Sequence, residues 1–254
     1  MILDAFHLKG KNALVTGSQT GLGAGIAVAF AQAGANVMLH GRDERGLSDV
    51  QAAIQAEGGN AKQCIGDVSE ASACQQIVDS TVAELGSIDI LVNNAGIIRR
   101  SPAADFSEKD WYEVLEINLS AVFRFCQLAG RRMLAQGRGK IINIASLLSF
   151  QGGVFVPSYA AAKGGVAQLT KALANEWAPN GVNVNAIAPG YMATDNTAAL
   201  RADAVRSQQI LERIPAKRWG AAGDLGGAAV FLASPASDYV HGHVLVVDGG
   251  WMGR

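Results

Sequence analysis

Tyr159 and Lys163 lie four residues apart in the segment Ser-Tyr-Ala-Ala-Ala-Lys-Gly that begins at Ser158. On an α-helix, this spacing places the phenol and the ammonium group on one face. A free tyrosine has a pKa of about 10, so its phenol is a poor base near neutral pH. A neighbouring ammonium group stabilises the phenolate and lowers that pKa, which would make the phenol a usable general acid and base. The pair alone is also typical of an ordinary helix surface, so the hypothesis depends on other residues.

A serine and a glycine-rich loop support this hypothesis. Ser146 precedes Tyr159 by thirteen residues and follows a predicted strand near 141–144, so its hydroxyl is expected to hold a substrate oxygen beside the phenol. The loop Thr16–Gly23 carries glycines at 17, 21 and 23, between a predicted strand near 13–15 and a predicted helix over 22–33. Free N–H groups at such a helix start favour a pyrophosphate, although a plain strand-to-helix turn also uses glycines. The loop therefore predicts a dinucleotide site.

Two charged residues follow the next predicted strands. Arg42 comes after Gly41 at the end of a strand near 37–39, where it would pair with a ribose 2′-phosphate. Asp67 comes after a third strand candidate, in the segment Cys64 to Val68, and would meet an adenine amino group. The alternatives are a solvated arginine and a helix N-cap aspartate. Arg42 favours NADP over NAD as the cofactor.

The elements that position these residues alternate along the chain. Further apolar runs of strand length lie near 88–92, 182–188 and 244–247, and segments of helical length separate the runs. This alternation predicts an α/β fold, a doubly wound Rossmann-type parallel sheet with helices on both faces. No repeat, linker or low-complexity tract interrupts it, so residues 1–254 are expected to form a single domain.

Composition excludes several other classes. Hydrophobic residues make up 49% of the 254 residues and charged residues 17%, so the chain is not intrinsically disordered. With 21 basic and 22 acidic residues, it has no electrostatic signature of a nucleic-acid or membrane-surface protein. The three cysteines and the His241–His243 pair lack the spacing of a metal site, so no metal is expected. Without a signal peptide or a long apolar stretch, the protein is expected to be cytoplasmic.

Five blocks occur in one order: Thr16–Gly23, Asn93–Gly96, Ser146, Tyr159 to Lys163, and Pro189-Gly190. In this order they resemble the short-chain dehydrogenase/reductase family over essentially the whole chain. The resemblance implies a seven-stranded sheet, a homotetramer and four catalytic residues, namely Asn118, Ser146, Tyr159 and Lys163. In the family, the tyrosine exchanges the proton, the lysine binds the nicotinamide ribose and lowers the tyrosine pKa, the serine orients the reacting oxygen, and the asparagine holds a water.

The residues expected to bind the cofactor, NADP or NAD, come from these blocks and from the strand ends. They are Gly17, Thr20, Gly21, Leu22, Gly23, Arg42, Asp67, Val68, Asn94, Ala95, Gly96, Tyr159, Lys163, Pro189, Gly190, Met192 and Thr194. The resemblance places Met192 and Thr194 at the nicotinamide carboxamide. Thr20 is not the basic residue that NADP-preferring members often carry in the loop, so both cofactors stay open.

Further segments, including Ser149–Gly153 and Ile214–Gly220, are similar to family members that act on sugar acids. They imply an alcohol–ketone oxidoreductase for a deoxy or keto sugar acid, such as 2-dehydro-3-deoxy-D-gluconate or 2-deoxy-D-gluconate. The expected substrate contacts are Ser146, Gln151, Tyr159 and Arg100. A mobile lid is expected around 191–220.

The substrate carboxylate needs a cation, and the sequence offers several. The candidates are Arg99, Arg100, Arg213, Lys217 and Arg218. Adjacent residues point different ways, so at most one of Arg99 and Arg100 is expected to reach the ligand. The alternative functions are a gluconate 5-dehydrogenase, a 3-oxoacyl-thioester reductase, and a catalytically silent dinucleotide sensor.

Overall fold

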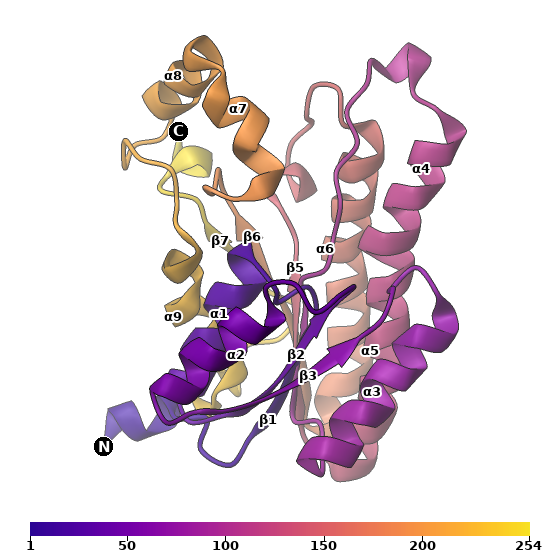
Figure 1. Ribbon diagram of the computed structural model, residues 1–254, viewed down its shortest axis with the longest axis vertical. Coiled ribbons are helices and arrows are strands. Elements are labelled where there is room, and N and C mark those ends of the chain that lie inside the picture. Colours follow the sequence, from indigo (N-terminus) through magenta and orange to yellow (C-terminus); the bar gives the residue numbers. More distant parts are fainter.

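Short apolar segments form the seven strands of one parallel sheet in the computed structural model, which describes residues 1–254 (Figure 1). The strands are β1 Asn12–Val15, β2 Asn36–Gly41, β3 Asn60–Ile65, β4 Ile90–Asn93, β5 Gly139–Ile144, β6 Val182–Pro189 and β7 Val244–Val247. Their order is β3-β2-β1-β4-β5-β6-β7, and every neighbouring pair is parallel. The predicted α/β fold with a seven-stranded parallel sheet is confirmed.

The third strand is the one that the apolar pattern misplaced. The candidate in the segment 64–68 was only partly right. β3 lies at Asn60–Ile65, so it begins earlier than expected, but it ends before Asp67 as predicted. β3 is an edge strand with a single neighbour, and it exposes polar side chains such as Lys62, so it carries little apolar signal. Every residue of the interior strand β6 is buried, by contrast, and its position was predicted within one residue.

Helices cover both faces of the sheet. They are α1 Gly21–Gln32, α2 Leu47–Ala56, α3 Ala71–Leu85, α4 Glu108–Leu115, α5 Ala121–Gln136, α6 Pro157–Trp177, α7 Ala198–Ala202, α8 Ala204–Arg213 and α9 Gly226–Ala233. None is long and apolar enough to cross a membrane.

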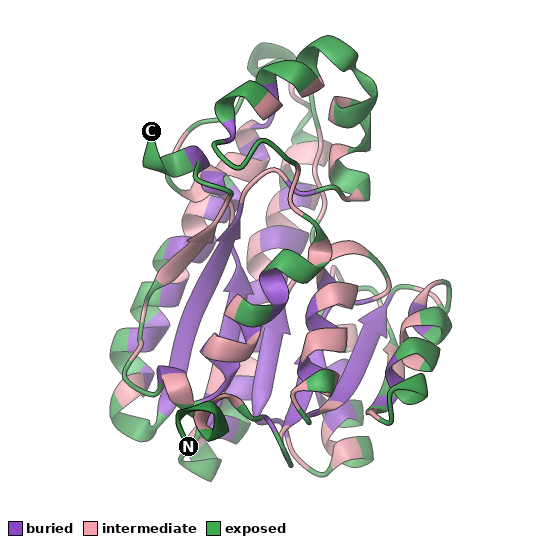
Figure 2. Cartoon of the chain, turned by 90° about the vertical axis from the view of Figure 1, so that its left-hand side faces the viewer, coloured by how far each residue is buried: buried purple, intermediate pink, exposed green.

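Alternating strand residues divide the core into two layers. Ala13 and Val15 of β1 pack with α1, α2 and α9, whereas Leu14 packs with α3, α5 and α6 on the other face. Figure 2 shows the buried strands enclosed between these layers. Because interior parallel strands are buried on both faces, their sequences are continuous apolar runs.

The functional region follows from the strand order. The order reverses between β1 and β4, and in parallel sheets a crevice forms beyond the carboxyl ends of the strands at such a point. The helices α7 and α8 lie beyond these strand ends rather than against the sheet (Figure 1).

Candidate active site

The glycine-rich loop is fastened to the end of β4. The Asn94 side chain donates hydrogen bonds to the carbonyl oxygens of Thr16 and Gly17, both at 2.9 Å. Gly17 has φ +63°, and a β-carbon there would lie 2.9 Å from the Cα of Ala95. A β-carbon on Gly23 would collide with the Gly17 carbonyl oxygen. These two glycines are therefore required by the close approach of β1, α1 and β4.

The start of α1 is open to an anion. Its N-cap residue, Thr20, makes no side-chain cap hydrogen bond, so the first N–H groups of the helix have no side-chain acceptor. Gly21, with φ +57°, lines the same groove. The uncapped helix start and its dipole fit a pyrophosphate.

His40, at the end of β2, holds this loop in place and was not singled out by the sequence. Its Nδ1 accepts a hydrogen bond from the Gly17 N–H at 3.2 Å, and its Nε2 donates to the Gly66 carbonyl at 3.0 Å. Burial lowers the pKa of His40 to about 4, so the ring is neutral at physiological pH. The only sequence signal for this role is its place directly before Gly41-Arg42.

Arg42 and Asp67 lie in the same groove, as predicted from their strand ends. The Arg42 side chain is exposed and makes no ion pair, and the main-chain N–H of Arg42 donates to the Gln19 side chain at 3.2 Å. Asp67 accepts hydrogen bonds from the N–H and hydroxyl of Ser69, which hold its pKa below the usual range. Asp67 does not cap α3, whose N-cap is Glu70, so the alternative interpretation of Asp67 as an N-cap is wrong.

Tyr159, Lys163 and Ser146 meet at the start of α6, where Pro157 occupies the first turn. The Lys163 ammonium lies 5.6 Å from the centre of the Tyr159 ring, so the i, i+4 pair shares one face as predicted. The Ser146 hydroxyl lies near enough to the Tyr159 hydroxyl to act on its pKa, and both residues line the same cavity. Ser149 donates to the Lys163 carbonyl at 2.6 Å, which ties the loop after β5 to α6.

The electrostatics of this group differ from the expectation that Lys163 lowers the tyrosine pKa. The Lys163 ammonium donates to the Ile144 carbonyl at 2.6 Å instead of pointing at the phenol. Burial raises the pKa of Tyr159, while the neighbouring Ser146 hydroxyl and the charge of Arg100 oppose that rise. Burial also lowers the pKa of Lys163 to about 8. In this arrangement, the phenol is protonated at neutral pH.

Asn118 is completely buried and lines neither of the two cavities at the site. Its side chain accepts from the Ile97 N–H and donates to the Ile97 carbonyl, both at 2.8 Å. It lies in a π-helical turn, Glu116–Ser120, between α4 and α5, and such turns are frequent at functional sites. The side chain therefore positions the loop after β4, and any contact with a water would have to come from its main chain.

A second cavity, of about 420 Å³, adjoins the groove. Ser146, Tyr159, Gln151 and Arg100, the predicted substrate contacts, all line it. Its volume is within the range of small-molecule sites. Three arginines and no acidic residue line this cavity, which favours an anionic ligand: Arg100, Arg206 and Arg213.

The other predicted cations are held elsewhere. Arg99 is paired with Glu113 at 3.0 Å, which turns it away from the cavity. Lys217 donates to the Glu212 carbonyl, and Arg218 is paired with Asp224 at 2.6 Å, outside the cavity. Arg206 and Trp251 were not predicted as ligand contacts, because nothing in their local sequence links them to Ser146.

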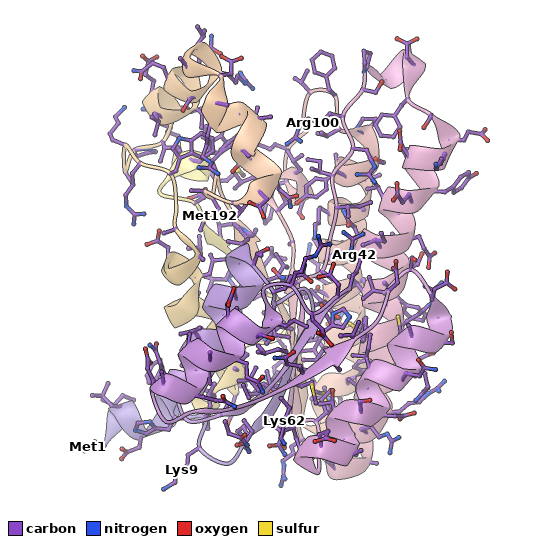
Figure 3. All side chains as sticks on the ribbon, viewed as in Figure 1. Met1, Lys9, Arg42, Lys62, Arg100 and Met192 are labelled. Carbon is purple, nitrogen blue, oxygen red and sulfur yellow. The ribbon has the colours of Figure 1, made fainter.

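Most of the predicted cofactor residues line the groove, which has a volume of about 260 Å³. Those in the groove are Gly17, Thr20, Gly21, Leu22, Arg42, Asp67, Val68, Asn94, Ala95, Gly96, Tyr159, Lys163 and Thr194. Gly23 lies beneath the loop, and Pro189 and Gly190 line the second cavity instead. The Met192 side chain is buried against Gly220, so only its main chain could reach a cofactor (Figure 3).

Comparisons with known proteins agree with this geometry. The family model described as enoyl-(acyl carrier protein) reductase matches residues 17–252. The 2-dehydro-3-deoxy-D-gluconate 5-dehydrogenase of Bacillus subtilis (strain 168) is 56% identical over 99% of this chain and 98% of its own. The Gluconobacter oxydans (strain 621H) gluconate 5-dehydrogenase is 44% identical over 97% and 96%.

Solved structures show the same similarity. A gluconate 5-dehydrogenase from Burkholderia cenocepacia J2315, in complex with NADP and tartrate, has a TM-score of 0.96 and 42% identity, with both chains covered completely. A candidate 2-deoxy-D-gluconate 3-dehydrogenase from Agrobacterium tumefaciens with bound NADP has a TM-score of 0.93 and 55% identity, and covers 99% of this chain and 100% of its own.

Proposed function

We infer that this chain, which belongs to the short-chain dehydrogenase/reductase family, is an NAD(P)-dependent dehydrogenase whose substrate is 2-dehydro-3-deoxy-D-gluconate. The proposal rests on one observation above all. Tyr159 borders both cavities, so its hydroxyl lies where a cofactor groove meets an arginine-lined pocket without acidic residues. A silent dinucleotide sensor would need neither the phenol nor the second cavity.

The groove fits a dinucleotide. It offers an uncapped helix start for the pyrophosphate, glycines that admit close approach, and an arginine that makes no ion pair at the ribose end. A bound nicotinamide cofactor would supply the hydride acceptor or donor. We assign Arg42 to the 2′-phosphate of NADP, and NADP is the cofactor bound by two similar structures.

The acid–base work falls to residues of this chain. Ser146 holds the substrate oxygen beside the Tyr159 hydroxyl, which gives its proton to a ketone or takes one from an alcohol. Lys163 is placed beside the phenol ring and toward the groove, where an ammonium group can bind ribose hydroxyls. Because burial raises the pKa of Tyr159, alcohol oxidation should be faster at alkaline pH and ketone reduction near neutrality.

Three further assignments belong to this proposal. Residues 191–220, which include α7 and α8, act as a lid over the second cavity. The enzyme works in the cytoplasm, and it assembles as a homotetramer.

A substrate panel tests the proposal. Purified protein is assayed with NADP and with NAD on 2-dehydro-3-deoxy-D-gluconate, 2-deoxy-D-gluconate, gluconate and a 3-oxoacyl thioester. The highest kcat/KM is expected for 2-dehydro-3-deoxy-D-gluconate. Gluconate is the second candidate, because a 44%-identical relative is a gluconate 5-dehydrogenase. Activity confined to the thioester, or none at all, would contradict the proposal.

A further inference from the structure

We propose that Arg213, stacked on Trp251, is the residue that binds the substrate carboxylate. The inference deepens the proposed function and rests on it for the identity of the acid. It begins from the second cavity, where three guanidinium groups face a space that no carboxylate of the protein lines. An excess of positive charge in one wall favours an anion, and the question is which arginine binds it.

Two of the three arginines already have acceptors within the protein. Arg100 donates to the Asn196 carbonyl at 3.0 Å and thereby links the loop after β4 to the lid segment. Arg206 donates to the Gln209 side chain at 3.2 Å. Arg213 makes neither an ion pair nor a hydrogen bond through its side chain. It is therefore the arginine whose full set of donors is open to a ligand.

Trp251 holds the Arg213 guanidinium in place. The guanidinium carbon lies 3.9 Å from the centre of the indole ring, a cation–π distance. Stacking fixes the plane of the guanidinium while it leaves the N–H edges free for a bidentate contact with a carboxylate. Trp251 is only 5% exposed, and its indole N–H has no acceptor in the protein. Trp251 also lines the cavity, so it supports the guanidinium at the cavity wall.

The position of Arg213 also fits the chemistry of the substrate. In a 5-dehydrogenase of a gluconate derivative, the reacting carbon lies near one end of the carbon chain and the carboxylate is the other end. The carboxylate must therefore lie away from Ser146 and Tyr159. Arg213 lines the second cavity from the last turn of α8, whereas Arg100, which also lines this cavity, is close enough to the Tyr159 hydroxyl for its charge to act there. Figure 3 shows Arg100 on the loop between β4 and α4, beside α7.

The test compares an acid with its neutral counterpart. Steady-state kcat and KM are measured for 2-dehydro-3-deoxy-D-gluconate and for its 1-amide, with NADP at saturation. In Arg213→Gln, KM for the acid should rise roughly 10²-fold with a small change in kcat, since a charge-assisted bidentate contact is lost. The amide should react as in the parent, which also shows that the variant is folded. Arg131→Gln, an exposed arginine of α5, is the matched control.

Each other result is decisive. An unchanged preference for the acid in Arg213→Gln overturns the proposal, as does a loss of preference that occurs in Arg100→Gln or Arg206→Gln alone. A parent enzyme that oxidises acid and amide equally well also overturns it. A parent enzyme that ignores 2-dehydro-3-deoxy-D-gluconate but prefers gluconate to gluconamide overturns the substrate assignment only, and Arg213→Gln is then tested on that pair.

Discussion

The phenol of Tyr159 is the single side chain on which turnover should depend most. Tyr159→Phe keeps the ring beside Lys163 but removes the group that exchanges the proton. General acid–base catalysis contributes roughly 10²–10⁴-fold, so kcat should fall by that factor. Binding of NADP, followed by titration calorimetry, should be nearly unchanged, because the groove has many other contacts. A Phe variant that retains most of its activity would contradict the assignment.

Arg42 should decide between the two cofactors. It is exposed and makes no ion pair, so its guanidinium is available to the 2′-phosphate that distinguishes NADP from NAD. Hydrogen bonds to charged groups contribute about 1.5–3 kcal/mol, so Arg42→Ala should weaken NADP binding roughly ten- to a hundredfold. The affinity for NAD should change little. Equal losses for both cofactors, measured as Kd values, would show that Arg42 is merely solvated.

Sequence reasoning found the residues whose spacing is local, but it could not single out those that converge from distant segments. Arg213 was one of five candidate cations, and Trp251 was not predicted at all. Tyr159 and Lys163 are one helical turn apart, so their shared face follows from the spacing alone. Arg213 and Trp251 come from α8 and the C-terminal segment, and only the fold brings them together beside Ser146. The effect of Lys163 on the tyrosine pKa depends on a distant segment too, since the Lys163 ammonium donates to the Ile144 carbonyl at the end of β5.

At the scale of elements, His40 connects the ends of β1, β2 and β3 through its contacts with Gly17 and Gly66. Its burial makes the stability of the fold sensitive to acid. Its pKa is about 4 in the folded chain and about 6.5 when the ring is free, so the unfolded chain binds more protons between these values. The free energy of unfolding should therefore decrease as the pH falls from 6.5 to 4, by about 3 kcal/mol from this group. Urea unfolding at several pH values measures this loss.

His40→Asn should be less stable at neutral pH, because it disturbs the contacts to Gly17 and Gly66, and it should lose part of the acid dependence. His7→Ala, which removes an exposed histidine, should keep the parental pH dependence. An unchanged slope in His40→Asn would mean that another group causes the acid sensitivity.

The strands were predictable from the sequence wherever helices bury them on both faces of the sheet. Interior strands such as β5 and β6 appear as apolar runs, and the glycines of the first loop mark where β1 ends and α1 begins. The edge strand β3 escapes this pattern because half of its surface faces solvent. The π-helical turn that holds Asn118 was not predicted, because the Asn118 side chain meets its hydrogen-bond partner, Ile97, only in the folded chain.

At the scale of the whole molecule, the remaining prediction is the homotetramer. The chain has a net charge of only −1, so it lacks the repulsion that keeps strongly charged proteins apart. Large apolar side chains stay exposed on the outer helices, with Tyr112 of α4 at 64% and Phe123 of α5 at 44%. Exposed apolar side chains of this size favour burial between subunits. We expect light scattering after size exclusion to give four times the chain mass of 26.4 kDa.

Phe123→Glu should reduce the measured mass, because a contact between subunits that covers position 123 would then have to bury a charge. Gln55→Glu, an equal charge change on the exposed side of α2, should leave the mass unchanged.

Ketone reduction in the dissociated Phe123→Glu variant then separates assembly from catalysis. Both cavities are lined by residues of one chain, so a dissociated subunit that stays folded should keep its pocket and its preference for the acid. A parent protein that elutes with the mass of one chain would contradict the tetramer, and a dissociated variant that is folded but inactive would show that the site depends on assembly.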